Sequence, residues 1–289
     1  MGLSGSSSES PRDPHAPIER TAEFRFYEEL NDFLPDQYRK RSFPYRFRGA
    51  PSVKDCIEAI GTPHTEVDLI LVDGRSVDFD HILRGGERVA VYPMFERLDV
   101  SPVTRLRPTP LRESRFVADV HLGTLARYLR LLGFDTVWRN DLQDQEIIRY
   151  SLEERRIILT RDLGILKDGR VTHGYWLRSI DPMAQVEEVV RVFDLGSQLA
   201  PYSRCMECNG TVSPISRREA APHVPLQVFL VYRDFKRCES CGRVYWAGSH
   251  QRRLRAVIEK AEAVSTDQVR ERRRHRAPDA ASADIQSNN

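Results

Sequence analysis

The chain contains two regions in which apolar residues recur with different periods. In the first region, residues 24–26 and 43–47 alternate between aromatic and polar side chains, which predicts half-buried strands. Residues 53–60 carry apolar side chains at helical spacing, and residues 68–72 and 88–92 predict two further strands. The order strand, strand, helix, strand, strand indicates a small α+β module.

The second region alternates strands with helices. Short apolar runs predict four strands, at residues 116–118, 136–138, 157–159 and 171–176. Helices with one apolar face are predicted to begin near His121, Asp144 and Asp181. This alternation indicates an α/β fold, in which helices cover both faces of a parallel sheet.

Acidic residues follow two of these strands and open one of the helices. Asp119 and Asp162 come just after strands, and Asp144 begins the helix between them. Each aspartate could simply cap a helix or a turn. Together they indicate more, because parallel strands end at one edge of a sheet, where α/β proteins bind ligands. Three carboxylates there repel one another unless a cation lies between them, so Asp119 and Asp162 are predicted ligands of Mg²⁺ or Mn²⁺.

Composition narrows the function only modestly. The 289 residues carry a net charge of +2, so no global field points to a polyanionic partner. The sequence has no apolar run long enough to cross a membrane and no secretory signal at its start, so a cytoplasmic protein is expected. Residues 1–20 have a composition typical of disorder, and residues 98–113 predict a proline-rich linker.

Four of the five cysteines form two Cys-x-x-Cys pairs, which are Cys205 with Cys208 and Cys238 with Cys241. In a reducing compartment such pairs indicate metal binding rather than disulfides, and four thiolates predict a structural zinc ion in a zinc ribbon. The pairs are further apart than usual, so a loop is expected at residues 214–225. Cys56 lies on an apolar helix face and is expected to be buried.

Basic and aromatic residues are interleaved around the cysteines. The basic residues are Arg204, Arg217, Arg218, Arg233, Lys236, Arg237 and Arg243, and the aromatic residues are Tyr232, Phe235, Tyr245 and Trp246. This mixture suits single-stranded nucleic acid, in which bases stack on rings and phosphates pair with cations. The aromatic residues could equally form the small core of the ribbon. Beyond residue 250 the chain is basic, with a short helix predicted around residues 254–261.

The second region resembles the PIN-like nucleases. More closely, it is similar to the ribonuclease domain named after the C-terminal part of the Mut-seven exonuclease, through residues 116–133 (FVADVHLGTLARYLRLLG) and 156–162 (RIILTRD). The resemblance covers roughly residues 114–250 and implies metal-dependent hydrolysis of RNA. It also implies that the catalytic acids are Asp119, Asp144 and Asp162. These nucleases usually carry a glutamate as a fourth acid; this sequence has no clear equivalent, and the candidates are Glu146, Asp141 and Asp181.

The first region resembles ubiquitin-like β-grasp domains. Residues 80–93 are similar to the end of β-grasp sulfur carriers, which act through a C-terminal Gly-Gly. Here Gly85-Gly86 precedes a last strand, so a turn is expected instead of carrier chemistry. A β-grasp module is a familiar companion of this nuclease domain, and its expected role is to dock a protein partner.

The sequence therefore predicts a cytoplasmic, metal-dependent ribonuclease with a structural zinc ion, catalytic Mg²⁺ or Mn²⁺, and RNA as its partner. The predicted segments are 1–20 disordered, 21–97 β-grasp domain, 98–113 linker, 114–197 nuclease domain, 198–250 zinc ribbon, and 251–289 basic helix and tail. Candidate phosphate-binding residues are Arg127, Arg130, Arg161 and His121, for which a solvated helix face or a packed histidine is the alternative. The other hypothesis is a non-catalytic RNA-binding or adaptor protein that keeps the fold and has a degenerate site.

Overall fold

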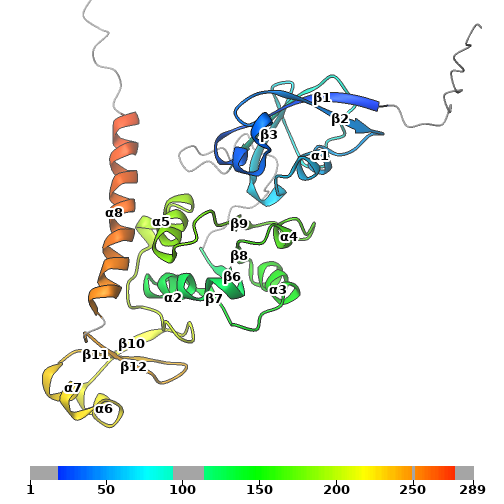
Figure 1. Ribbon diagram of the computed structural model, residues 1–289. Helices are drawn as coiled ribbons and strands as arrows, with labels where there is room; N and C mark the ends of the chain where they lie inside the picture. The colour runs from blue at the N-terminus through cyan, green and yellow to red at the C-terminus, as the bar shows by residue number, and fades with distance from the viewer. Residues whose placement is uncertain (1–18, 94–113, 249–250, 277–289) are drawn as a thin grey trace, which may run out of the picture. The chain divides into compact units, whose positions relative to one another are not determined.

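A computed structural model describes residues 19–93, 114–248 and 251–276 (Figure 1). The chain divides into two compact units, one formed by most residues up to Pro93 and the other by the later residues together with Pro63–Glu66. The disorder expected at both ends and the expected linker fall almost entirely outside the described residues. The exception is Glu19 and Arg20, which already belong to the first strand.

The first unit is a mixed five-stranded sheet in the order β2-β1-β5-β3-β4. Its central strands β1 and β5 are parallel, and the other pairs are antiparallel. The elements are β1 (Glu19–Phe26), β2 (Phe43–Arg48), α1 (Val53–Ile60), β3 (Val67–Val72), β4 (Arg75–Val77) and β5 (Arg88–Pro93). This arrangement confirms the expected ubiquitin-like module and adds β4, a strand too short for its pattern to reveal.

Local sequence signals set the ends of α1 and of the last turn. Ser52 and Asp55 form a reciprocal capping box at the start of α1, and Gly61 ends it with a φ of 136°. Gly85 and Gly86 also have positive φ angles, 98° and 96°, which glycine adopts without steric cost. These two glycines therefore form the expected turn before β5.

The second unit contains a four-stranded sheet in the order β7-β6-β8-β9, in which all strands are parallel. The strands are β6 (Phe116–Ala118), β7 (Thr136–Val137), β8 (Ile157–Thr160) and β9 (Gly174–Trp176). The helices are α2 (Gly123–Leu131), α3 (Asp144–Glu154), α4 (Leu163–Leu166) and α5 (Pro182–Val192). The PIN-like α/β fold expected for this region is confirmed.

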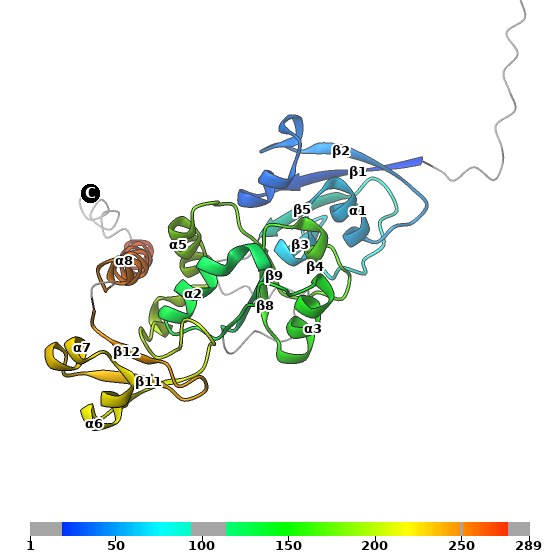
Figure 2. The ribbon, with the colours of Figure 1, turned by 60° about the horizontal axis from the view of Figure 1, so that its bottom comes forward.

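Helices cover both faces of this sheet (Figures 1 and 2). Side chains alternate along each strand, so Phe116 and Leu159 pack into one core with α2 and α5. Val117 and Ile158 point to the opposite face, into a second core with α3 and α4. The two central strands, β6 and β8, are buried on both faces, as their continuous apolar runs predict.

The segment predicted as a zinc ribbon, called the ribbon from here on, consists of three antiparallel strands, β10 (Val212–Ile215), β11 (Phe235–Cys238) and β12 (Val244–Trp246). The segment between β10 and β11 is more ordered than the loop expected there, because it forms α6 (Arg217–Ala220) and α7 (Leu226–Val231). Ser216 and Glu219 form a capping box that starts α6.

The last helix, α8 (Gln251–Arg276), is much longer than the short helix predicted for this segment. Val257, Ala261 and Val264 are buried in the core that α2 and α5 share. Lys260 pairs with Glu187 at 3.1 Å, and the Gln268 amide donates to the Arg191 carbonyl at 2.8 Å. The helix thus forms part of the second unit, which we call the nuclease unit after the resemblance noted above. Within the described ranges, no helix is both long and apolar enough to cross a membrane.

Candidate functional site

Asp119 and Asp162 lie at the same edge of the parallel sheet. Strand β6 pairs in parallel with β8, and Ala118 stands opposite Leu159. The ladder continues one residue further, because the Asp119 N–H donates to the Leu159 carbonyl at 3.0 Å. Asp162 follows two residues after the end of that paired segment. The strand order therefore brings the two aspartates from distant positions in the sequence to neighbouring strand ends.

The Thr160 side chain joins these two segments. Its hydroxyl donates to Asp119 Oδ2 at 2.7 Å and accepts the Asp162 N–H at 2.8 Å. Thr160 is fully buried and the Asp119 residue is only 7% exposed, so this pair of hydrogen bonds is shielded from water. The sequence analysis did not identify Thr160, although its place in the Thr-x-Asp motif was the available signal.

The two aspartates differ in how they use their oxygens. Asp162 Oδ1 accepts the Gly164 N–H at 2.7 Å, so Asp162 does cap α4, as the simpler interpretation held. Asp119 precedes the 3-10 turn Val120–Leu122 without a side-chain capping bond. The bond from Thr160 uses Oδ2 of Asp119, and the bond from Gly164 uses Oδ1 of Asp162. Neither of these bonds involves the other carboxylate oxygen of the residue.

Asp144 opens α3 but is not its cap. Gln143 and Glu146 form the capping box, and Asp144 is the first helical residue, with an exposed side chain. Helix α3 follows β7 in a parallel sheet, so its start lies at the edge where the strands end.

The candidate fourth acids already have other partners. Asp141 Oδ1 accepts from Arg139 Nε at 2.9 Å, and Glu146 accepts from the same guanidinium at 3.1 Å. Asp181 caps α5 by accepting the N–H groups of Met183 and Ala184. The contacts of these acids are those of structural residues.

A hard cation fits the donor chemistry of this edge, since Asp119 and Asp162 each present carboxylate oxygens. The three aspartates, however, are not tightly gathered. Across the described residues, the four cysteines are the one group of three or more Cys, His, Asp or Glu side chains whose ligand atoms all lie within 4.8 Å of one another. An ion bound by all three aspartates would therefore need their carboxylates to move closer together.

The candidate phosphate-binding residues have three different environments. Arg161 Nη1 donates to the carbonyls of residues 177, 178 and 179 at 2.8 to 2.9 Å and so orders the loop after β9. Arg127 pairs with Glu207 of the ribbon. His121 is exposed beside Asp119.

Arg130, a candidate phosphate-binding residue, is buried in the structure. It is only 2% exposed, and its guanidinium donates to the carbonyls of Thr136, Trp138, Met206 and Glu207 at 2.8 to 3.3 Å. Burial lowers its pKa, although an arginine remains protonated. Because these carbonyls surround it, we assign Arg130 an anchoring role in place of phosphate binding.

The four cysteines form a compact cluster that could hold a zinc ion. Cys205 and Cys241 lie 3.7 Å apart through their sulfurs, and Cys208 and Cys238 lie 3.4 Å apart. Zinc–sulfur bonds of about 2.3 Å in a tetrahedron place the sulfurs about 3.8 Å from one another. The N–H groups of Cys208 and Cys241 also point at the sulfurs of Cys205 and Cys238. The cluster thus has the spacing of a structural site.

The ribbon is attached where the parallel strands begin, which is the side of the sheet opposite to the strand end that carries Asp119. Asn209, next to Cys208, accepts the Thr136 N–H at 3.0 Å and donates to Asp135 at 2.7 Å. Thr136 begins β7, so it lies where the parallel strands start. Asp135 also pairs with Arg156, which precedes β8. The turn that carries Cys205 and Cys208 therefore contacts the sheet where its strands begin. Asp119 and Asp162 lie where the strands end.

Comparisons with known proteins agree with this architecture. Residues 114–258, half of the chain, match the family described as "Mut7-C RNAse domain". Residues 19–99 match the family described as "Mut7-C ubiquitin". No curated protein and no solved structure matches the chain significantly.

Proposed function

Because the chain belongs to the Mut7-C RNase domain family, we propose that it is a metal-dependent ribonuclease that hydrolyses phosphodiester bonds of RNA at the edge formed by Asp119 and Asp162. Membership of this family supports a nuclease role in general. The observation that carries the proposal is the Thr160 hydroxyl, which ties the Asp119 carboxylate to the Asp162 backbone at the end of the central strands. Ligands of α/β sheets bind at this edge.

Asp119 and Asp162 are the proposed ligands of Mg²⁺ or Mn²⁺, and Asp144 contributes a third carboxylate from the start of α3. When bound, the ion polarises the phosphate and favours ionisation of a water molecule. Thr160 holds Asp119 in one orientation and so limits the reorganisation needed on binding. His121 and Arg161 lie beside the aspartates in the sequence and are the proposed contacts for the phosphate groups. The bonds of Arg161 to the carbonyls of residues 177–179 use Nη1, so the rest of its guanidinium is proposed to face the phosphate.

The direct test is cleavage of labelled RNA and DNA by the purified chain, with added Mn²⁺ or Mg²⁺ and without either ion. We expect hydrolysis of RNA that requires the added ion. A chelator would also remove zinc from the ribbon, so the metal-free arm uses dialysis, with the zinc content measured before and after. Cleavage that is unchanged without the added ion contradicts the proposal.

The second candidate is an RNA-binding adaptor that keeps the fold without catalysis. Two observations favour it: Asp162 caps α4, and the three aspartates do not form a close metal cluster. An adaptor would bind RNA with the same affinity whether or not Asp119 and Asp162 are replaced by asparagine, and would cleave RNA in neither form.

The ubiquitin-like unit is the proposed site for a protein partner, in keeping with its match to the ubiquitin domain of this family. We place the reaction in the cytoplasm, where unpaired Cys-x-x-Cys thiolates remain available for zinc.

A further inference from the structure

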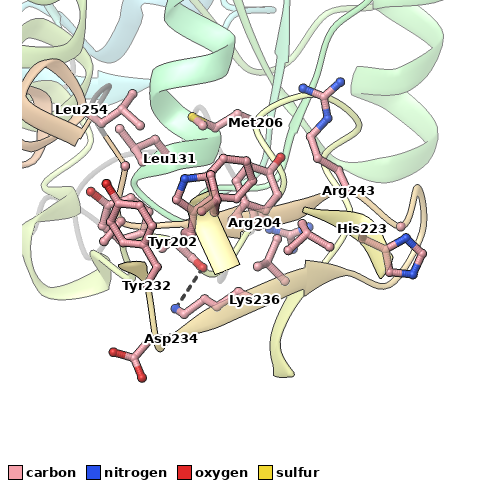
Figure 3. Close-up of a pocket in the computed structure, with 18 of the residues that line it drawn as sticks. Leu131, Tyr202, Arg204, Met206, His223, Tyr232, Asp234, Lys236, Arg243 and Leu254 are labelled. Atoms are coloured by element: carbon pink, nitrogen blue, oxygen red, sulfur yellow. Dashed lines mark hydrogen bonds between the residues drawn. The ribbon is translucent and has the colours of Figure 1, made fainter. Parts of the chain in front are cut away.

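The ribbon carries a pocket that the proposed chemistry does not use. The pocket has a volume of about 1030 Å³, the scale of a ligand site. Its walls come from β11, β12, the end of α7, and the ends of α2 and α8 at Leu131 and Leu254 (Figure 3). It therefore lies where the ribbon meets the nuclease core, away from the edge that carries Asp119.

Flat aromatic rings form a large part of the wall. They belong to Tyr202, Tyr232, Tyr245 and Trp246. Tyr245 is held in place because its hydroxyl lies 2.9 Å from the sulfur of Cys205. Trp246 is 37% exposed, and its indole lies so close to Gly248 that a side chain there would come within 2.8 Å of Nε1. The orientations of the Tyr245 and Trp246 rings are thus restricted before any ligand binds.

Basic side chains line the pocket beside these rings, and Arg243 and Lys236 carry its positive charge. Figure 3 shows Arg243 and His223 on one side of the pocket and Tyr202 and Tyr232 on the other. Lys236 donates to the neutral carbonyl of Tyr202 at 3.3 Å, so this contact leaves its charge uncompensated.

The acids nearby do not cancel this charge. Glu207 pairs with both Arg243 and Arg127, so one carboxylate serves two guanidinium groups. The lining also includes one acid, the exposed Asp234. The pocket therefore combines exposed π-faces with an excess of positive charge.

We propose that this pocket binds unpaired bases of single-stranded RNA, which stack on Trp246 and Tyr232 while Lys236 and Arg243 pair with the flanking phosphates. Stacking on aromatic rings combined with a basic surface is the general way in which proteins bind single strands. A duplex keeps its base faces covered, so it is excluded from this mode. The proposal rests on the proposed function only for the choice of RNA as the polyanion.

The position of the pocket predicts how it would serve cleavage. The ribbon is attached where the strands begin, and the acids lie where they end, with α2 running between the two edges over about 14 Å. A bound strand must span that distance to reach Asp119. The pocket should therefore favour long single strands and contribute nothing to a dinucleotide.

The test measures binding of a fluorescent single-stranded oligouridine and of a duplex to full-length Asp162→Asn protein, without added divalent ions. Trp246→Ala and Tyr232→Ala are compared with Leu230→Ala, which removes a side chain on α7 that is 64% exposed and does not line the pocket. We expect each pocket variant to bind the single strand at least about tenfold more weakly, since about 1.4 kcal/mol is tenfold and one stacked base supplies that much. Leu230→Ala should bind as the parent does.

Zinc content and far-UV circular dichroism show whether each variant keeps the ribbon. If Trp246→Ala loses zinc, Tyr232→Ala decides, because Trp246 pairs with the cysteine-bearing strand β11 whereas Tyr232 lies outside the paired strands. Folded Tyr232→Ala protein with the parent's affinity overturns the proposal, and so does equal binding of duplex and single strand. A loss shared by Leu230→Ala would point to a protein-docking face and would also overturn it. Cleavage by Asp162→Asn under added Mn²⁺ would contradict the catalytic assignment alone.

Discussion

The Thr160 hydroxyl has an unusual position for a threonine at the end of a strand. It donates to one aspartate and accepts from the backbone of the other, and the buried environment strengthens both bonds. A threonine side chain is stiff at χ1, so the hydroxyl holds Asp119 in one rotamer. We therefore regard Thr160 as a positioning residue for the acidic edge.

Replacing Thr160 by valine keeps the shape and removes the hydroxyl. The charge-assisted bond to Asp119 is worth about 1.5 to 3 kcal/mol, so kcat should fall by about 10- to 100-fold and more Mn²⁺ should be needed for half-maximal rate. Steady-state kinetics across a Mn²⁺ titration measure both effects. Thr160→Ser restores the hydroxyl and should recover most of the rate; a serine variant as slow as the valine variant would argue against this role.

At the scale of elements, the contact between α2 and the turn that carries Cys205 and Cys208 helps to hold the ribbon. Arg130 reaches from α2 to the carbonyls of Met206 and Glu207, which lie between the first two cysteines. This buried guanidinium couples the order of the ribbon to the order of the α/β core, in addition to the contacts of Asn209 with Thr136 and Asp135.

Arg130→Met should destabilise the fold by about 3 kcal/mol or more, because it leaves several buried carbonyls without a donor. Arg127→Met, on the same helix, removes an exposed pair with Glu207 and should cost about 1 kcal/mol or less. Urea unfolding of the two variants measures the difference. Equal losses would show that Arg130 does not anchor the ribbon.

Zinc should bind at one ion per chain, and Cys205→Ser should abolish it. Loss of one thiolate leaves an incomplete tetrahedron, and the ribbon has a very small core of its own. Elemental analysis measures the ion, and limited proteolysis should cut the variant within the ribbon first. Full zinc content in the purified variant would show that the cluster is not the zinc site.

The junction between β7, β8 and the ribbon should also respond to acid. Burial alone would raise the pKa of Asp135, but hydrogen bonds from Arg156 and Asn209 outweigh it and lower that pKa below its ordinary value. The stabilisation from this carboxylate is therefore present above about pH 4 and is lost as the pH falls through the lower, folded-state pKa.

Thermal unfolding of wild type and Asp135→Asn against pH tests this dependence. The difference in Tm between wild type and Asp135→Asn should be largest near neutral pH and should decrease below about pH 4. A Tm difference that stays constant down to low pH would mean that the ionised carboxylate of Asp135 does not contribute to the stability of the fold.

Some features of the fold could be predicted from the sequence, and others depend on tertiary contacts. The placement of Asp119 and Asp162 at neighbouring strand ends could be predicted because each comes after a continuous apolar run, and parallel pairing places such ends together. The role of Arg130 could not be found in this way, because its burial depends on carbonyls more than seventy residues away. The length of α8 was underestimated because its apolar residues are sparse among charged ones and become buried only by packing on the core that α2 and α5 share.

At the scale of the whole chain, the nuclease unit separates chemistry from anchoring. The ends of the strands carry the aspartates, while their beginnings carry the ribbon with its basic, aromatic pocket. Under the proposed function, the strand ends would hold the metal ion and the ribbon at the strand beginnings would recognise the RNA strand. The ubiquitin-like unit is a separate compact body and provides the proposed partner site.

The most direct measurement of the central claim is RNA cleavage by Asp162→Asn with saturating Mn²⁺. The asparagine keeps an oxygen that can accept the Gly164 N–H, so the cap of α4 survives while the charge of the metal ligand is lost. Asp267→Asn, an exposed change on α8, serves as the matched control. We expect that Asp162→Asn retains zinc and RNA binding yet shows no cleavage, while the control cleaves normally. Cleavage by Asp162→Asn at the wild-type rate would contradict the assignment of Asp162 as a metal ligand in catalysis.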